Sequence, residues 1–336
     1  MDEITLEEKR IHYLDTAKVI AVFLVVFAHL FSTYSAERVF IYSFHVPFFF
    51  LVSGLFHKWK GKVQWKKYIL MLFVNVLGAN VLYVFLGGVF YQLGLWTWTP
   101  SGFSIADTIF RTWYNMFKCF LLGVVFTRDL PNGVTWFLIA LFYSKLGTDI
   151  LQKYPKYRFI ILLLILLLIP LSLFVKLPLW LCQGAVAFSF YIIGFRFKDK
   201  ILAFVDGCKC KWLIVVVLLG INVLLTLLNG KVSLAVLLFG RLLRPCNLLV
   251  FYINALVGTL MLILLSSYYN KANTIITSVS KSLMPILVLQ QFFRTTIRSI
   301  AGGSLTNIAL ATLLSIAIIT ICVFLNKMVD YVKIPR

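Results

Sequence analysis

Long apolar runs alternate with short polar segments along almost the whole chain. Each run is close to the roughly 20 residues that an α-helix needs to cross a bilayer, and none has the period-two alternation of a membrane β-barrel strand. The pattern predicts an all-α, polytopic integral membrane protein with about ten transmembrane helices. The predicted spans are residues 17–34, 40–56, 68–90, 135–151, 159–175, 179–195, 212–229, 248–266, 283–300 and 307–326.

The segment 104–126 departs from this pattern. It is apolar enough to cross, but it carries Asp107, Arg111 and Lys118 at helical spacing. If it crossed, the basic loops that follow would move to the outer side, against the tendency of Lys and Arg to stay in cytoplasmic loops. We therefore expect it to be a re-entrant or interfacial helix on the outer side.

Composition and charge agree with a membrane protein. Hydrophobic residues make up 61% of the 336 positions, charged residues only 13%, and the formal net charge is +20. The basic residues are divided among short loops, which indicates membrane topology and contact with anionic lipids, not nucleic acid. Since the lysine-rich loop 57–67 is expected to face the cytoplasm, both termini should lie on the cytoplasmic side of a bacterial inner membrane.

The chain is expected to form a single membrane-embedded domain over residues 1–336, because no segment between the spans is long enough to bury its own core. Its acidic N-terminus does not resemble a cleavable signal, so the first apolar run is expected to be a retained span. The close pair Cys208 and Cys210 has no second pair to complete a zinc site, so no metal is expected.

All four histidines lie between residues 12 and 57, and His29 and His45 fall inside predicted spans. An imidazole at membrane depth is costly, so it marks a candidate functional site. The two rings belong to consecutive antiparallel spans at similar depth, and can therefore share one cavity. Imidazole is a natural general base near neutral pH, which makes this pair the candidate catalytic residues. The alternative is that each ring only bonds a neighbouring helix.

The other polar residues of the spans narrow the function. No Asp or Glu lies at the centre of a span, which argues against a pump that relays protons through buried carboxylates. Lys18, about 16 Å along the first helix from His29, is a candidate for binding the phosphates of a cytoplasmic donor. Its alternative role is snorkelling and pairing with Asp15 at i,i+3. Arg294 and Arg298 are either interfacial anchors or contacts to an anionic glycan.

The first two spans resemble the membrane acyltransferase-3 family. The resemblance rests on Tyr-Leu-Asp-Thr-Ala-Lys at 13–18 leading to His29, and on Phe-His-Val-Pro-Phe-Phe-Phe-Leu-Val-Ser-Gly at 44–54. The opening of the fourth span, Trp-Phe-Leu-Ile-Ala-Leu-Phe at 136–142, is similar to the branch related to fucose 4-O-acetylase. The family signature is an Arg, ten residues and a His, whereas this chain has Lys18 before His29. Where the family often has a late Tyr-x-x-His, this chain has Leu287 and Gln290, so any proton role of that later histidine is lost.

The resemblance implies acyl transfer, most often of acetyl, from cytoplasmic acyl-CoA to a sugar hydroxyl of a cell-surface polysaccharide or its lipid-linked precursor. In that chemistry His29 either accepts the hydroxyl proton or carries a transient acyl group, and His45 orients the acceptor or stabilises the oxyanion. The candidates for binding acyl-CoA are Lys18, Asp15, Arg241 and Arg244. The candidates for binding the acceptor are Trp136, Arg294, Gln290 and Glu37. Because Arg241 and Arg244 fall on the outer side, either their donor role or the predicted topology there must be wrong.

Two other classes of function fit the same sequence. An exporter or flippase of a glycan or lipid-linked sugar would consume no acyl-CoA and would keep its activity without either imidazole. A membrane scaffold would tolerate loss of both rings. A homodimer is compatible with the sequence, which specifies neither the acceptor sugar nor the acyl chain.

Overall fold

The computed structural model describes residues 11–32, 35–96, 114, 132–171, 177, 180–230 and 245–332. Within these ranges the regular structure is helical, and the β-type pairing is one isolated bridge between Phe31 and Leu305. The predicted all-α class is therefore confirmed for the described residues. Most of the segment 104–126, and both Arg241 and Arg244, lie outside them.

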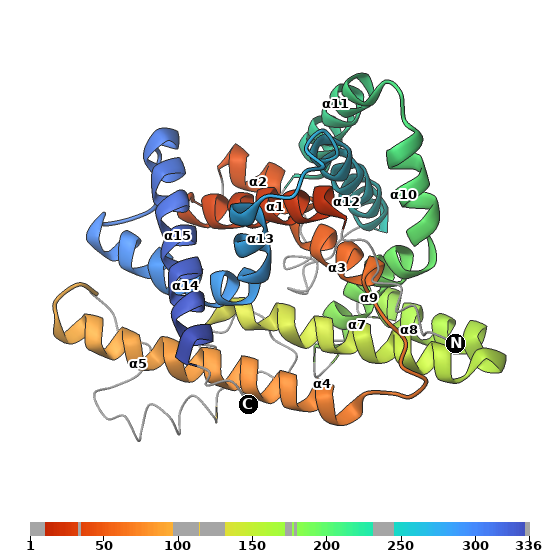
Figure 1. Ribbon diagram of the computed structural model, residues 1–336, viewed down its shortest axis with the longest axis horizontal. Helices are drawn as coiled ribbons and strands as arrows, with labels where there is room; N and C mark the ends of the chain where they lie inside the picture. The colour runs from red at the N-terminus through yellow and green to blue at the C-terminus, as the bar shows by residue number, and fades with distance from the viewer. Residues whose placement is uncertain are drawn as a thin grey trace, which may run out of the picture.

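The helices follow the apolar runs of the sequence (Figure 1). The first half contains α1 (His12–Leu30), α2 (Ala36–Tyr42), α3 (His45–Leu55), α4 (Trp65–Leu72), the π-helical turn η1 (Phe73–Leu77), α5 (Gly78–Gln92), the 3-10 turn η2 (Gly133–Thr135) and α7 (Trp136–Lys153). The second half contains the 3-10 turn η3 (Pro155–Tyr157), α8 (Arg158–Leu171), α9 (Leu181–Arg196), α10 (Lys198–Gly207), α11 (Lys211–Asn229), α12 (Pro245–Ser266), α13 (Thr274–Lys281), α14 (Leu283–Ile300) and α15 (Ile308–Val332).

Seven helical segments of the described residues are long and apolar enough to cross a membrane, which identifies a multi-pass membrane protein. They are His12–Leu30, Ala36–Leu55, Trp65–Gln92, Gly133–Lys153, Lys211–Asn229, Asn247–Ser266 and Ile308–Val329. α13 and α14 qualify only as a pair, bent by 71°. The predicted number of about ten spans is therefore not confirmed. A helix does lie in every predicted span, but α9 has only 16 residues, and 14 residues of α8 fall within the described range.

The helices divide into a buried inner group and an apolar outer group. In the apolar stretch of each candidate span, 67% of the α1 residues and 72% of those in the segment Ala36–Leu55 are buried inside the protein. The buried share is 11% for α11 and 22% for α15. Large apolar side chains such as Leu227 of α11 and Phe324 of α15 are exposed. These surfaces suit contact with lipid, whereas α1 to α3 are enclosed by protein.

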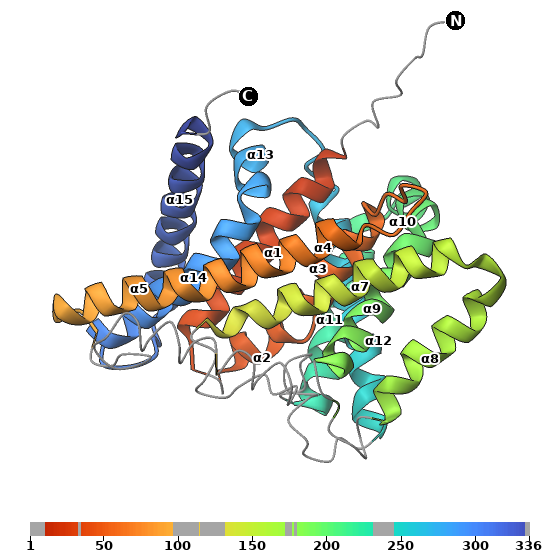
Figure 2. The same cartoon turned by 90° about the horizontal axis from the view of Figure 1, so that it is seen from below.

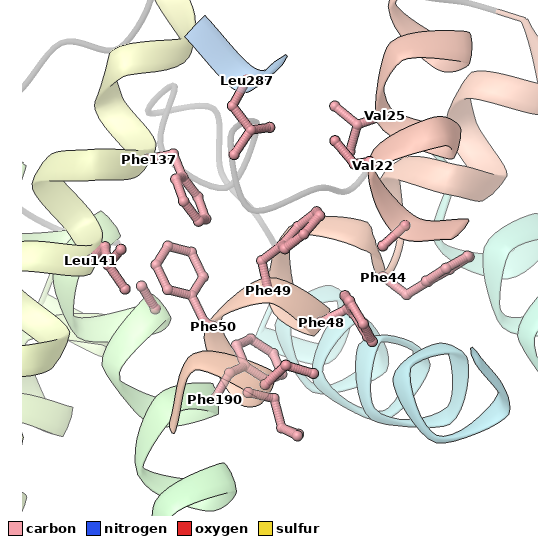
Figure 3. Packing of buried hydrophobic residues seen from close by; sticks show 14 of the residues in the cluster. Val22, Val25, Phe44, Phe48, Phe49, Phe50, Phe137, Leu141, Phe190 and Leu287 are labelled. Atoms are coloured by element: carbon pink, nitrogen blue, oxygen red, sulfur yellow. The ribbon is translucent and has the colours of Figure 1, made fainter. Parts of the chain in front are cut away.

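The helix α3 lies at the centre of the core. Figure 3 shows its Phe48, Phe49 and Phe50 between Val22 and Val25 of α1 and the aromatic side chains of neighbouring helices. α3 packs most closely on α9, because each helix has a glycine at the crossing. A Cβ atom on Gly54 of α3 would meet the backbone carbonyl of Tyr191 in α9. Such small residues allow two helix backbones to approach closely within a membrane.

The helices α1 and α14 lie side by side and point in the same direction. Near the start of α1, the hydroxyl of Ser280 in α13 donates to the Asp15 carboxylate at 2.7 Å. Just past its end, Arg298 of α14 donates to the Phe31 carbonyl at 2.7 Å. The molecule thus has a Lys18 end, where α1 begins, and a His29 end, where α1 finishes. In Figure 2 the start of α1 and the end of α15 lie on one side of the molecule, and α2 lies on the other.

Candidate active site at the His29 end

The connection from α1 to α3 includes α2, which brings polar side chains back over the end of α1. The Ser35 hydroxyl caps α2 by accepting a hydrogen bond from the Arg38 backbone N–H at 3.3 Å. α2 ends at Tyr42, and α3 begins at His45, so the predicted second span consists of two helices. Because Arg38, Tyr42 and His45 are spaced by four and three residues, their side chains emerge on one side of this connection.

Tyr42 lies between the two candidate catalytic histidines. Its hydroxyl is 3.1 Å from Nδ1 and 3.2 Å from Nε2 of His29, so it hydrogen-bonds one ring nitrogen at a time. The Tyr42 ring is 4.6 Å from the His45 ring, measured between centroids. The predicted proximity of the two histidines is therefore found, but the contact passes through a tyrosine.

The His45 ring is held by the backbone. Its Nδ1 lies 2.9 Å from the Ile41 carbonyl, and the residue is only 3% exposed. A carbonyl oxygen only accepts hydrogen bonds, so Nδ1 carries the proton and Nε2 of the neutral ring has a free lone pair. That tautomer favours an acceptor-orienting role for His45 over oxyanion stabilisation, because a neutral Nε2 has no proton to donate.

Three arginines surround this cluster. The Arg38 guanidinium lies over the Tyr42 ring, 4.7 Å from its centroid, and donates to the Phe31 carbonyl at 3.1 Å. Arg298 donates to the same carbonyl. Arg294 lies one turn before Arg298 on α14, which runs beside α1 in the same direction, so it is level with the last turn of α1 where His29 lies. Arg294, predicted to contact the acceptor, therefore lies in the same cluster as His29.

The helix α14 is oriented by polar contacts on two sides. Thr295 bonds the Tyr83 hydroxyl at 2.8 Å, and the Val288 carbonyl accepts from the Asn132 side chain at 2.9 Å. These bonds, together with that of Arg298, fix which face of α14 meets α1. Gln290, another predicted acceptor contact, is 2% exposed and neither polar atom of its amide has a partner among the described residues.

Lys18 and Asp15 lie at the opposite end of α1. The Lys18 ammonium is 3.2 Å from the Asp15 carboxylate and sits over the Phe56 ring at 4.2 Å from its centroid. The i,i+3 pair expected as the alternative role of Lys18 is therefore present. The roles of both residues in binding acyl-CoA stay predictions.

The remaining predicted site residues are placed unevenly. Trp136 is 7% exposed and belongs to the hydrophobic core at the start of α7, where it packs on Phe137. Glu37 is half-buried in the first turn of α2. Their contacts to an acceptor stay predictions, as do the donor contacts of Arg241 and Arg244, which fall outside the described residues.

Sequence reasoning missed Tyr42 and Arg38. In the sequence, the segment between the first two predicted spans resembles a short break. The structure shows that the helix α2 begins there. The spacing of Arg38, Tyr42 and His45 was the available signal, because it matches one face of a helix. Only the fold shows that this face turns toward His29.

A second buried pair, His57 and Asp149, joins α3 to α7 at the Lys18 end. The His57 Nε2 is 3.1 Å from the Asp149 carboxylate, and its Nδ1 is 2.8 Å from the Tyr191 hydroxyl. Burial lowers the pKa of His57 below its ordinary 6.5, while the charge of Asp149 opposes part of that shift. The Asp149 carboxylate also accepts from the Gln64 backbone N–H at 3.2 Å, which anchors the loop before α4. The pair therefore fixes three elements to one another.

The described residues contain no group of three or more His, Cys, Asp or Glu side chains that could hold a metal ion. Use of acyl-CoA without a metal stays a prediction.

The comparisons with known proteins identify the chain at the level of its family. A family model described as an acyltransferase domain, of the acyltransferase-3 type, matches residues 11–327. The match covers the candidate site and every described helix up to most of α15. Neither the curated proteins nor the solved structures gave a match.

Proposed function

The chain belongs to the acyltransferase-3 family, and on this premise we propose that it is a membrane O-acyltransferase of surface glycans. It moves an acyl group, preferentially acetyl, from acyl-CoA to a sugar hydroxyl of a cell-surface polysaccharide or its lipid-linked precursor. The observation that supports this proposal best is the half-buried His29 ring, bonded to Tyr42 and close to His45 and three arginines.

In the proposed reaction His29 acts as the general base. When one of its ring nitrogens donates to the Tyr42 oxygen, the other has a lone pair that accepts the sugar hydroxyl proton. The sugar oxygen attacks the thioester carbonyl, the carbon–sulfur bond breaks, and the CoA thiolate takes the proton back from His29. The free Nε2 of His45 accepts a hydrogen bond from the acceptor and orients it. The nearby guanidinium charges stabilise the negative oxygen that develops on the carbonyl.

The alternative route has His29 attack the thioester itself. It would then form an acyl-imidazole and release CoA before the sugar binds. The same residues fit both routes. Rapid mixing with acetyl-CoA alone separates them, because only the acyl-enzyme route releases a stoichiometric burst of thiol without an acceptor.

The two ends of α1 suit the two substrates. His29 is eleven positions from Lys18, a rise of about 16 Å along the helix. An acyl-CoA whose phosphates bind at the Lys18 end would reach His29 through its long pantetheine arm. The acceptor would then approach from the His29 end. With the Lys18 end cytoplasmic, the enzyme takes its donor from the cytoplasm of a bacterial cell and modifies a glycan on or near the outer face.

The test is His29→Ala, with His12→Ala at the start of the same helix as the matched control. We expect His29→Ala to abolish O-acetylation of the surface polysaccharide, measured by mass spectrometry, because the base is removed. His12→Ala should retain it. Both purified proteins should remain monodisperse and should still be protected from heat by acetyl-CoA, since the donor phosphates bind elsewhere. Normal O-acetylation by His29→Ala would remove the catalytic assignment. Transport of a glycan without consumption of acetyl-CoA would instead identify an exporter.

A further inference from the structure

We infer that the acyl acceptor carries an anionic group, a phosphate or a carboxylate, close to the hydroxyl that is acylated, and that Arg38, Arg294 and Arg298 bind this group. The inference rests on the proposed function and specifies its acceptor class.

The three guanidinium groups converge at the candidate active site. Arg38 and Arg298 come from different parts of the chain but donate to the same oxygen, the Phe31 carbonyl, at 3.1 and 2.7 Å. Arg294 lies one turn before Arg298 on α14. Arg38 lies over the ring of Tyr42, and the hydroxyl of the same Tyr42 hydrogen-bonds His29. An anion held by these groups would therefore lie beside the proposed base.

None of these three arginines forms an ion pair with a carboxylate in the described part of the chain. Arg294 donates to the neutral Gln291 side chain at 3.0 Å, and the Nε atoms of Arg294 and Arg298 are buried without partners there. Gln290, one turn before Arg294, is buried with both amide atoms unpaired. Buried guanidinium N–H groups without partners are costly, and an anion with several oxygens would accept hydrogen bonds from several of them together.

The position of the cluster also argues against a role in topology. The lysine-rich loop that follows Phe56 begins at the Lys18 end, because the Lys18 ammonium lies over the Phe56 ring. The arginine cluster is at the opposite end. Cations that merely set orientation gather on one side of the membrane and face water or lipid headgroups. Arg294 and Arg298 are instead partly or largely enclosed by protein, which fits a ligand site better.

The donor and the transition state explain this cluster less well than an anionic acceptor does. The phosphates of acyl-CoA are separated from the thioester by the whole pantetheine arm, so they lie far from His29 when the thioester reaches it. The oxyanion of the transition state exists only during the chemical step, so it does not offset three positive charges while the substrate is bound. An anion on the acceptor lies beside the guanidinium groups from binding until release.

The first experiment measures anion binding to the purified full-length protein. Its melting temperature is measured at increasing concentrations of glucose 6-phosphate, of glucuronate and of glucose, all at constant ionic strength. We expect both anions to protect, and glucose to have no effect. The anion that protects at lower concentration distinguishes a phosphate from a carboxylate source. Arg294→Gln should raise the half-saturating anion concentration at least about tenfold, since it removes a charge-assisted contact. The exposed Arg196→Gln at the end of α9 is the matched control and should match the wild type.

Arg294 is chosen because its described hydrogen bond stays within α14, whereas removal of Arg38 or Arg298 would also release the Phe31 carbonyl. Arg294→Lys, which keeps the charge but loses the planar fork, should fall between wild type and Arg294→Gln. Equal protection by glucose and by the anions would overturn the inference. Equal anion affinity in wild type and Arg294→Gln would overturn it as well.

The second experiment separates this inference from the proposed function. Protection by acetyl-CoA should have the same half-saturating concentration in Arg294→Gln and wild type, within about twofold. A large increase in the half-saturating acetyl-CoA concentration would assign the arginines to donor binding and overturn the inference. The proposed acyltransferase function would stand. A wild type that binds the anions but never releases thiol from acetyl-CoA, even with anionic sugars present, would contradict the proposed function and leave the anion site intact.

Discussion

At the scale of single residues, Tyr42 would determine, in the proposed mechanism, which nitrogen of His29 acts as the base. The hydroxyl is within hydrogen-bonding distance of both ring nitrogens, so it can fix one tautomer in the resting protein and exchange bonds as the ring turns. Tyr42 is a positioning residue in this scheme. Its effect should appear in the chemical step and not in donor binding.

We predict that Tyr42→Phe lowers kcat for acetyl transfer roughly ten- to a hundredfold, the loss of one hydrogen bond of about 1–3 kcal/mol to the base. The KM for acetyl-CoA should stay within about twofold, because Lys18 is at the other end of α1. The pH–rate profile should shift as well, since the His29 ring loses its partner. Tyr13→Phe is the control, because the Tyr13 hydroxyl is buried without a partner among the described residues. A normal kcat in Tyr42→Phe would assign Tyr42 to packing alone.

The sequence predicted His29, His45, Arg294 and Gln290 as site residues, a prediction that stays open, and the fold brings the first three together at one end of α1. The reason is that a polar or ionisable side chain stands out in an apolar run. Tyr42 and Arg38 did not stand out, because both types are common at the ends of membrane helices. Their importance comes from a contact between α1 and α2 that no local pattern encodes.

At the scale of elements, helix positions were predictable and helix continuity was not. Each apolar run predicted a helix, and a helix is found in every one of them. The second run, 40–56, is nevertheless divided between α2 and α3 at Ser43 and Phe44. The Ser43 hydroxyl bonds the Phe40 carbonyl at 2.8 Å, a local bond that competes with the helical pattern. His45 is the first residue of α3, three positions after Tyr42.

The close crossing of α3 and α9 gives the prediction at this scale. Gly54→Ala should destabilise the protein by about 1–3 kcal/mol, because the added Cβ meets backbone that no side-chain rotation can move. Thermal unfolding in detergent should therefore begin at a lower temperature. Gly220→Ala in α11 is the control, since nothing lies within 4 Å of its Cβ position, and it should be neutral or mildly stabilising. Equal unfolding temperatures for Gly54→Ala and the wild type would show that the two helices separate easily.

At the scale of the whole molecule, the basic loops gather at the Lys18 end. His57 packs edge-on against Phe195 with 5.2 Å between ring centroids, so the loop 57–67 and the end of α9 lie together. The basic segment 196–211, which contains α10, starts from the same place. The sequence predicted this sidedness from loop charge alone. It could not give the number of spans, because α9 has only 16 residues and α13–α14 is a pair bent by 71°, features that an apolar run does not specify.

The orientation can be measured with Cys210, which is exposed at the start of α11. We predict that a membrane-impermeant maleimide labels it in inverted membrane vesicles and leaves it unlabelled in intact cells, because the Lys18 end should face the cytoplasm. Labelling of a Cys208→Ser/Cys210→Ser variant gives the background from the other cysteines. A signal at Cys210 in intact cells would invert the topology and place the donor site outside.

The Phe31 carbonyl, which accepts from both Arg38 and Arg298, has a consequence for the order of events. An incoming anion competes with this oxygen for the same N–H groups. On the proposed roles, arrival of the sugar would loosen the final turn of α1 and leave its imidazole freer to rotate toward the thioester. We expect such a linkage to hold the base idle until both partners are seated, so that little donor is lost to water in the meantime.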